Sequence, residues 1–280
     1  MQNIKNCFQS LKKDYFALSS FCLLITICLI AILAPLITPF DPLQINLDEI
    51  NQAPSIEHLL GTDHQGRDIL SRIIYGSRYS LSISLLATCL SLSIGISLGL
   101  LAGYTGGIID KAIVMIIDIT MAFPALLLAI GISIILKPGV TSVIIALSLV
   151  GWTSFSRLTR GMVISLKETD FIKASQALGC SPFRIILKHL LPNCLPIIIT
   201  ATSLKIGSII LSEAALSFLG LGIQPPLPTW GSMINLGRDY IKIQPWSTIA
   251  PGLAIAITIV SFNLLGEFIE KYLNPKKVNP

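Results

Sequence analysis

Asp118, Lys205 and Glu213 are ionisable residues that stand inside long apolar stretches of this 280-residue chain, and Glu267 lies near the end of another. A charge in the apolar interior of a membrane is costly unless it is paired or wetted, and proton relays use such residues. Lys205 and Glu213 are eight residues apart, about two turns along one helix face and beyond direct contact. The residues therefore leave two interpretations open: pairing between helices, or lining of a transport pathway.

Motifs of soluble enzymes do not account for these charges. The sequence has neither the G-x-x-x-x-G-K-[ST] loop that cradles phosphates nor an HExxH zinc motif. We therefore expect a non-enzymatic chain with no cofactor or metal of its own. His58, His64 and His189 are scattered along the chain, so we expect solvent-exposed loop positions for them. No CxxC occurs among the six cysteines, which we interpret as apolar packing residues.

Composition indicates a membrane protein. Hydrophobic residues make up 52% of the chain and charged residues 12%, and the mean hydropathy is +0.76, whereas soluble domains carry about a quarter charged residues. The apolar residues come in blocks that are too long for ordinary strands. These features predict an all-α polytopic membrane protein and exclude a soluble β-protein. The net charge of +5 is attributed to loops that set topology rather than to nucleic-acid binding.

Six apolar segments approach the length of about 20 residues that a helical span requires. They cover residues 16–37, 79–103, 112–136, 140–155, 195–219 and 247–268. The fourth is short, and we expect its helix to continue toward Gly161. The first follows Lys5, Lys12 and Lys13, as a cleavable signal peptide would, but its apolar run is long and Ala34-Pro35-Leu36 is a poor cleavage site. We therefore predict an uncleaved anchor and six transmembrane helices.

Basic residues predict the orientation, because loops rich in Lys and Arg remain in the cytoplasm. With the N-terminus inside, the cytoplasmic side holds Lys5, Lys12, Lys13, Lys111, Arg157, Arg160, Lys167, Lys173, Arg184, Lys188, Lys271, Lys276 and Lys277. The opposite side holds Arg67, Arg72, Arg78, Lys137, Arg238 and Lys242, which acidic residues there offset. Both termini are therefore predicted to be cytoplasmic.

Two further patterns predict local structure. Ser91, Gly95, Gly99 and Gly103 recur at every fourth position, which gives a helix face that another helix can approach closely. Residues 66–75 carry Ile and Leu at helical spacing with charged residues between them. We predict that this segment is an extracytoplasmic helix lying on the membrane surface.

Residues 167–193 join the fourth and fifth predicted spans and are too polar to cross a bilayer. Asp170 suits the positive N-terminus of a short helix over residues 171–178, and Gly179 can end it in the left-handed conformation. Pro182 favours the start of a second helix. The apolar face of that second helix is predicted to comprise Phe183, Ile186, Leu187 and Leu190. The residues alone leave open whether this loop lies on the membrane surface or receives another protein.

Three stretches of the chain resemble the permeases of ABC importers. The loop at 171–192, FIKASQALGCSPFRIILKHLLP, is similar to their EAA loop, and GWTSFSRLTRGMVISLKETD leads into it. The two other stretches are GTDHQGRDILSRIIYGSRYSL at 61–81 and EAALSFLGLGIQPPLPTWGSMI at 213–234. Both resemble the C-type inner-membrane permease of dipeptide and oligopeptide importers, a family that also includes nickel permeases. Where that family has Glu and a second Ala in the loop, this sequence has Lys173 and Ser175.

The resemblance implies a type I ABC importer permease fold, in which the helix at 171–178 transmits movement from a cytoplasmic ATPase. The residues that it implies for this contact are Phe171, Lys173, Ala174, Ser175, Ala177, Leu178 and Gly179. It divides the chain into residues 1–78, with the N-terminal tail, first span and extracytoplasmic segment, a permease domain at 79–270 with its coupling loop at about 161–195, and a cytoplasmic tail at 271–280.

The implied function is import of dipeptides or oligopeptides across the bacterial inner membrane. The implied partners are a homologous second permease, two ATPases that bind ATP, and an extracytoplasmic substrate-binding protein. A nickel-importing permease of the same family is one alternative. A secondary transporter is the other, and it would use Asp118, Glu213 and Lys205 for ion coupling and show an internal repeat with discontinuous spans. No convincing repeat is visible in the sequence.

Overall fold

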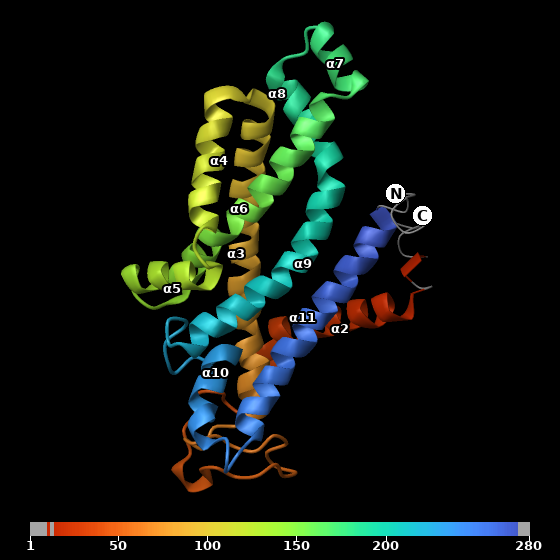
Figure 1. The fold of residues 1–280 in the computed structure, drawn as a ribbon. Helices are drawn as coiled ribbons and strands as arrows, with labels where there is room; N and C mark the ends of the chain where they lie inside the picture. The colour runs from red at the N-terminus through yellow and green to blue at the C-terminus, as the bar shows by residue number, and fades with distance from the viewer. Residues whose placement is uncertain (1–9, 12–13, 274–280) are drawn as a thin grey trace.

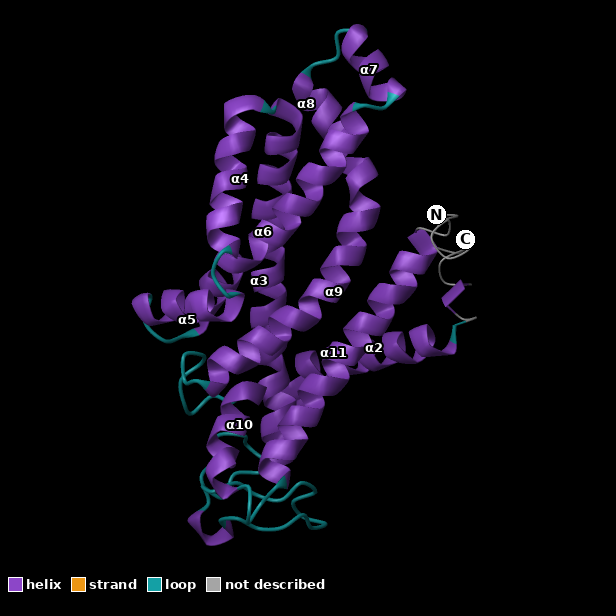
Figure 2. Cartoon of the chain, in the orientation of Figure 1, coloured by secondary structure: helices purple, strands orange, loops and turns teal. Residues whose placement is uncertain are grey.

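The computed structural model describes residues 10–11 and 14–273, and every regular element in that part of the chain is a helix (Figure 2). The long elements are α2 (Tyr15–Ile37), α3 (Ile69–Thr105), α4 (Gly107–Met121), α5 (Ala125–Ile135), α6 (Val140–Lys167), α9 (Leu191–Phe218) and α11 (Trp246–Leu273). The short ones are η1 (Leu47–Glu49), α7 (Asp170–Ala177), α8 (Pro182–Ile185), η2 (Ile186–Leu190), α10 (Trp230–Gly237) and η3 (Arg238–Tyr240). Of the residues predicted to set topology, Lys5, Lys12, Lys13, Lys276 and Lys277 lie outside the described residues.

The predicted membrane architecture is confirmed. Five helices are long and apolar enough to span a membrane, and the number is six if α4 and α5 together form one broken span. The fourth span does continue beyond Gly161, to Lys167. The third is not one straight helix, because α4 and α5 meet at 91°. Pro124 lies at that break as the N-cap of α5. It favours a break there because it lacks a backbone N–H and disfavours helical geometry in the residue before it.

The predicted small-residue face joins α3 to α6. A Cβ added to Gly95 would lie 2.5 Å from the Cβ of Phe155, and one added to Gly99 would lie 2.7 Å from the backbone oxygen of Ser156. The two helices can therefore approach this closely because no side chain separates them. The letters Gly95-Ile96-Ser97-Leu98-Gly99 also match a G-x-S-x-G nucleophile motif. Ser97 instead lies inside α3 and donates to the backbone oxygen of Ser93, so this is a packing segment.

The predicted surface helix at 66–75 is wrong. The helix begins at Ile69 and continues without interruption as α3 to Thr105. Asp68 caps it by accepting a hydrogen bond from the backbone N–H of Ser71, and Arg72 is 2% exposed. The charged residues that were expected to face water are instead paired inside the loop before α3, which removes the amphipathic face that the pattern suggested.

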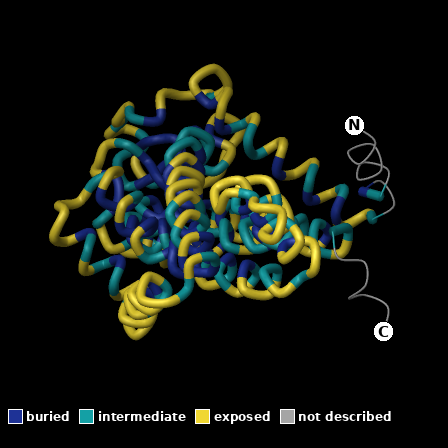
Figure 3. The backbone as a smooth tube through the Cα atoms, turned by 90° about the horizontal axis from the view of Figure 1, so that it is seen from above, coloured by how far each residue is buried: buried dark blue, intermediate teal, exposed yellow. Residues whose placement is uncertain are grey.

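The helices form an elongated bundle with α7 at one end and the loop before α3, together with α10, at the other (Figure 1). Seen from above, buried segments gather toward the centre, whereas exposed segments lie mainly at the periphery (Figure 3). One cluster of buried side chains includes Ile83 of α3, Val143 of α6 and Ile209 of α9. Many large apolar side chains on the outer helices remain exposed, as expected for surfaces that face lipid or another subunit.

Candidate functional site

The helix predicted to contact the ATPase is present as α7, shifted by one residue from the expected 171–178. Thr169 is its N-cap, and Gly179 follows it with φ +73°. The N–H of Gly179 donates to the oxygen of Gln176 at 2.9 Å, and that of Cys180 donates to the oxygen of Ser175 at 3.1 Å. This pair of bonds is a Schellman motif, in which a residue in the left-handed region ends a helix. The predicted stop at Gly179 is therefore confirmed.

α7 is attached to the bundle through one side chain and is otherwise open. Ile172 is 0% exposed and packs in a cluster with Val163 of α6 and Ile185 of α8. The other residues predicted for the contact lie together on α7 and its C-terminal turn: Phe171, Lys173, Ala174, Ala177, Leu178 and Gly179 are exposed and Ser175 is half-buried. Leu178 is 85% exposed. An apolar side chain this open at the tip of the molecule suits a surface that another protein covers.

Lys173 forms an ion pair with Glu168, with 3.1 Å between Nζ and Oε2. Both side chains are mostly exposed, at 56% and 79%, so solvent screens the pair and it contributes little to stability. The charge of Lys173 therefore remains open to a partner at the place where the family pattern has Glu.

The second helix of the loop differs from the prediction. The backbone is helical without interruption from Pro182 to Phe218, and the turn η2 before Pro192 is a wider π-helical one. Such a turn accommodates Pro192, because proline cannot donate a bond to residue 188 and would clash with its carbonyl. The widened turn also changes which side chains face inward: Ile185 and Leu190 are buried, whereas Phe183 is 72% and Leu187 is 43% exposed.

The charges within the spans contact different helices and do not meet one another. Asp118 of α4 pairs with Arg157 of α6, with 2.7 Å between Oδ1 and Nη2. Lys205 of α9 donates from Nζ to Oγ of Ser154 in α6 at 3.3 Å. Glu213, also in α9, is 0% exposed and accepts a bond from the hydroxyl of Ser217 at 2.7 Å. Glu213 is therefore buried within the bundle, whereas the Asp118–Arg157 pair is exposed on the surface of the chain.

A second pair joins the same two helices one turn further along α6. Arg160 donates from Nη2 to Oδ2 of Asp110 at 2.7 Å. Sequence reasoning did not pair these residues, although acids at 110 and 118 and arginines at 157 and 160 recur at helical spacing on α4 and α6. Glu267, the remaining charge singled out from the sequence, is exposed near the end of α11.

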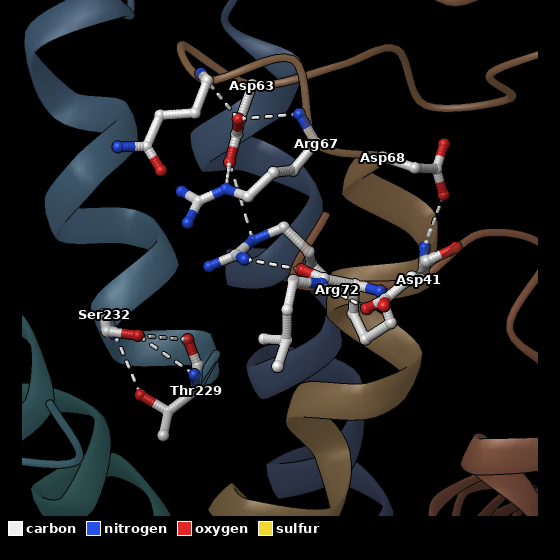
Figure 4. Close-up of polar contacts among 11 residues, drawn as sticks. Asp41, Asp63, Arg67, Asp68, Arg72, Thr229 and Ser232 are labelled. Atoms are coloured by element: carbon white, nitrogen blue, oxygen red, sulfur yellow. Dashed lines mark hydrogen bonds and ion pairs between the residues drawn. The ribbon is translucent and has the colours of Figure 1, made fainter. Parts of the chain in front are cut away.

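The end of the bundle opposite α7 holds a polar network that sequence reasoning missed (Figure 4). Asp63 forms ion pairs with Arg67, at 2.8 Å, and with Arg72, at 3.6 Å. Arg72 also donates to the backbone oxygen of Pro42 at 2.8 Å. These bonds fold the loop back over the start of α3. The density of Asp and Arg between residues 63 and 72 was the available signal.

His58 belongs to the same network, and the expectation of an exposed loop histidine was wrong. It is 3% exposed, with Nδ1 2.9 Å from Oδ1 of Asp68 and Nε2 3.4 Å from Oε2 of Glu49. Burial alone would lower the pKa of His58, but the hydrogen bonds and charges of Asp68 and Glu49 together raise that pKa above its ordinary value. The imidazole therefore links the N-cap of α3 to the loop.

Two stretches that carried the resemblance, at 61–81 and 213–234, meet at this end. Trp230, which begins α10, donates from its backbone N–H to Oγ of Ser80 at 3.2 Å and from its indole to the oxygen of Ile73 at 3.1 Å. Thr229 and Ser232 form a capping box that fixes the start of α10. Motifs about 150 residues apart in the sequence thus build one structural unit.

The fold of the chain has similar counterparts among solved structures. It is similar to solved structures titled as inward-facing conformations of the MetNI methionine ABC transporter, in two crystal forms, with TM-scores of 0.60 and 0.58. Sequence identity is 20% and 21%, and each comparison covers 73% of this chain and 97% or 96% of the other. At such identity the likeness shows the fold alone, and it confirms the predicted fold class.

The chain belongs to the family of binding-protein-dependent transport system inner membrane components, whose pattern matches residues 95–279. Residues 4–54 match the N-terminal TM domain of oligopeptide transport permease C. The resemblance seen in the sequence is thereby confirmed.

Named relatives cover almost the whole chain. The dipeptide transport system permease protein DppC of Alkalihalophilus pseudofirmus is 43% identical, over 97% of this chain and 90% of the relative. The di/tripeptide permease protein DppC of Pseudomonas aeruginosa is 39% identical, over 99% and 93%. The glutathione transport system permease protein GsiD of Escherichia coli is 39% identical, over 95% and 88%.

Proposed function

We propose that this chain is the transmembrane permease subunit of an ATP-driven importer of dipeptides or other short peptides. It lies in the inner membrane beside a second permease, above two cytoplasmic ATPases that bind the ATP, and beneath an extracytoplasmic substrate-binding protein. Relatives named for dipeptide, di/tripeptide and glutathione transport support a short peptide rather than nickel as cargo.

The observation that carries this proposal is the position of α7. It lies beyond the ends of the spans and connects α6 to the helix that continues into α9 (Figure 1). Because Ile172 anchors it to both of those helices, a push on α7 reaches two spans at once. A rigid element between two spans can convert closure of a neighbouring domain into tilting of those spans.

The distribution of exposed charges between the two ends of the bundle supports the proposed orientation. The α7 end presents Lys173, Arg184 and Lys188 as exposed residues, whereas the opposite end exposes Asp41, Asp48 and Glu57. Since Lys and Arg concentrate on the cytoplasmic side, α7 faces the cytoplasm and the loop before α3 faces outward. Both termini are then cytoplasmic, which makes α7 accessible to an ATPase.

Reconstitution tests the function directly. The full complex, assembled in proteoliposomes with its binding protein, is expected to accumulate a labelled dipeptide only when ATP is supplied, and to accumulate no Ni²⁺ above background. ATP with the hydrolysis-deficient ATPase serves as the control. Uptake driven by a proton gradient without ATP would instead establish the secondary-transporter alternative.

A further inference from the structure

Charged side chains lie on an open face of the chain formed by α4, α6 and α9. The side chains of Asp118 and Arg157 are 60% and 55% exposed although they pair with each other. Ser154 lies on the same side of α6 one turn before Arg157. Its hydroxyl oxygen accepts a hydrogen bond from Lys205 of α9. Both Ser154 and Lys205 stand at the midpoint of their helices. We define the polar face as these four residues together with Ser208, which is exposed on α9, and Ser212, which is half-buried there.

The charges of the polar face exclude lipid as its neighbour. The hydroxyls of Ser208 and Ser212 donate to backbone oxygens one turn back in α9, so these serines alone could face hydrocarbon. Lys205 at mid-span could not, since charged groups in membranes turn to a water-filled cavity or to protein. The polar face therefore borders either an aqueous pathway or the second permease.

Lys205 distinguishes between these two neighbours. Arg157 is already neutralised by Asp118, whereas the contact described for Lys205 is a neutral hydroxyl at 3.3 Å. The polar face thus carries one uncompensated positive charge. In contrast, where a charge joins α4 to α6, as Arg160 does, an opposite charge, Asp110, neutralises it. A cation at mid-span that has no such partner is suited to binding an anion transiently.

We propose that the polar face lines the aqueous pathway and that Lys205 binds a carboxylate of the peptide in transit. This inference rests on the proposed function, because a peptide with a free C-terminus always carries one carboxylate whatever its sequence. Such a contact recognises the class of substrate rather than a particular side chain. Its hydrogen bond to Ser154 holds the ammonium in place between passages without neutralising it.

Chemical rescue at position 205 tests both parts of the inference in the reconstituted complex. In a background from which the native cysteines have been replaced, Lys205→Cys is expected to lower peptide uptake by about tenfold, the range expected for one lost charge-assisted bond. A methanethiosulfonate that attaches an aminoethyl group rebuilds a cationic side chain and should restore uptake. The reagent that attaches a sulfonatoethyl group should react but leave uptake low or lower it further. Ile199→Cys is the matched control, because it is 47% exposed on α9 and lies on another face of the helix from the polar face.

Three results would overturn the inference. Unchanged uptake in Lys205→Cys would show that the cation is not needed. Failure of both reagents to modify Cys at position 205, with no loss of ATP-driven function at Ile199→Cys, would show that the second permease covers this face. Equal rescue by the aminoethyl and sulfonatoethyl groups would show that the side chain acts through its size. Since the reagents report accessibility to water in any case, this test can fail while ATP-driven uptake by the unmodified complex still supports the proposed function.

Discussion

At the scale of single residues, His58 shows how the loop before α3 is held in place. Its imidazole stands between Asp68, which caps α3, and Glu49 in the loop, and the Phe40 ring lies beside it, with centroids 4.5 Å apart. A buried imidazole between two carboxylates is stabilised in its protonated form. The loop is thus held partly by a histidine whose pKa is raised above its ordinary value.

The stability of this loop should therefore fall as the outside pH rises. The pKa of His58 is raised in the folded protein, so the stabilisation is complete below the unfolded value of about 6.5 and is lost as pH passes through the folded value. Hydrogen exchange of residues 46–68 in the assembled complex, corrected for intrinsic rates, should show stronger protection at about pH 6 than at about pH 8. His58→Gln should remove this difference, whereas His64→Gln should retain it. Equal protection of the wild-type loop at both pH values would show that protonated His58 does not stabilise the loop.

At the scale of elements, the close approach of α3 and α6 sets the frame on which the other helices pack. The spacing of Ser91, Gly95, Gly99 and Gly103 predicted that face correctly, because periodicity within one helix is local information. The end of α7 at Gly179 was predictable for the same reason. The break at Pro124 and the π-helical turn before Pro192 were not predicted, although the sequence contains both prolines. The backbone accommodates a proline in several ways, and tertiary packing selects among them.

Gly99→Ala should destabilise the chain by separating these two helices. The added Cβ would lie 2.7 Å from the Ser156 backbone oxygen and from the Thr159 Cβ, and overpacking of this kind costs about 1–3 kcal/mol. Gly161→Ala is the matched control, because it lies in α6 with no atom within 4 Å of the added carbon. Thermal unfolding of the detergent-solubilised complex should show a lower midpoint for Gly99→Ala alone. An unchanged midpoint in that variant would mean that the helices are not in close contact.

Lys173→Glu should weaken transport although it restores the residue that the family pattern carries. It replaces the ion pair with Glu168 by two like charges on the exposed side of α7, and an ATPase matched to Lys173 would meet the wrong charge. Peptide uptake is expected to fall by about fivefold or more, a typical coupling effect. Lys188→Glu, at the same end but outside α7, should leave uptake near normal. Higher uptake in Lys173→Glu would indicate that the partner kept a surface suited to Glu.

At the scale of the whole molecule, the sequence predicted the membrane class, the helical spans and the family. It did not predict how the end opposite α7 is built. The network of Asp63, Arg67 and Arg72, and the contact of Trp230 with Ser80, depend on segments that are distant in the sequence. Hydrophobic periodicity reports only which face of a helix is apolar. It gives no information on which loop covers a charged residue, so Arg72 was assigned to water.

The proposed orientation makes a prediction for the whole chain. Single cysteines at Asp48 and at Lys276, in a background without native cysteines, should react with an impermeant thiol reagent from opposite sides of the membrane. Intact cells should label the first position, and inverted vesicles should label the second. Labelling of both positions from the same side would contradict cytoplasmic termini.

The central claim is that α7 receives movement from the ATPase, and Gly179→Val tests it most directly. Gly179 has φ +73° with no atom within 4 Å of an added Cβ, so a β-branched residue there costs about 1–2 kcal/mol of backbone strain and re-aims α7 without disturbing a buried core. Gly106→Val has the same features, with φ +67° and open space, but lies between α3 and α4. Peptide taken up per ATP hydrolysed, measured in proteoliposomes with equal amounts of complex, should fall at least about fivefold in Gly179→Val and remain near normal in Gly106→Val. Normal coupling in Gly179→Val would contradict the account of α7.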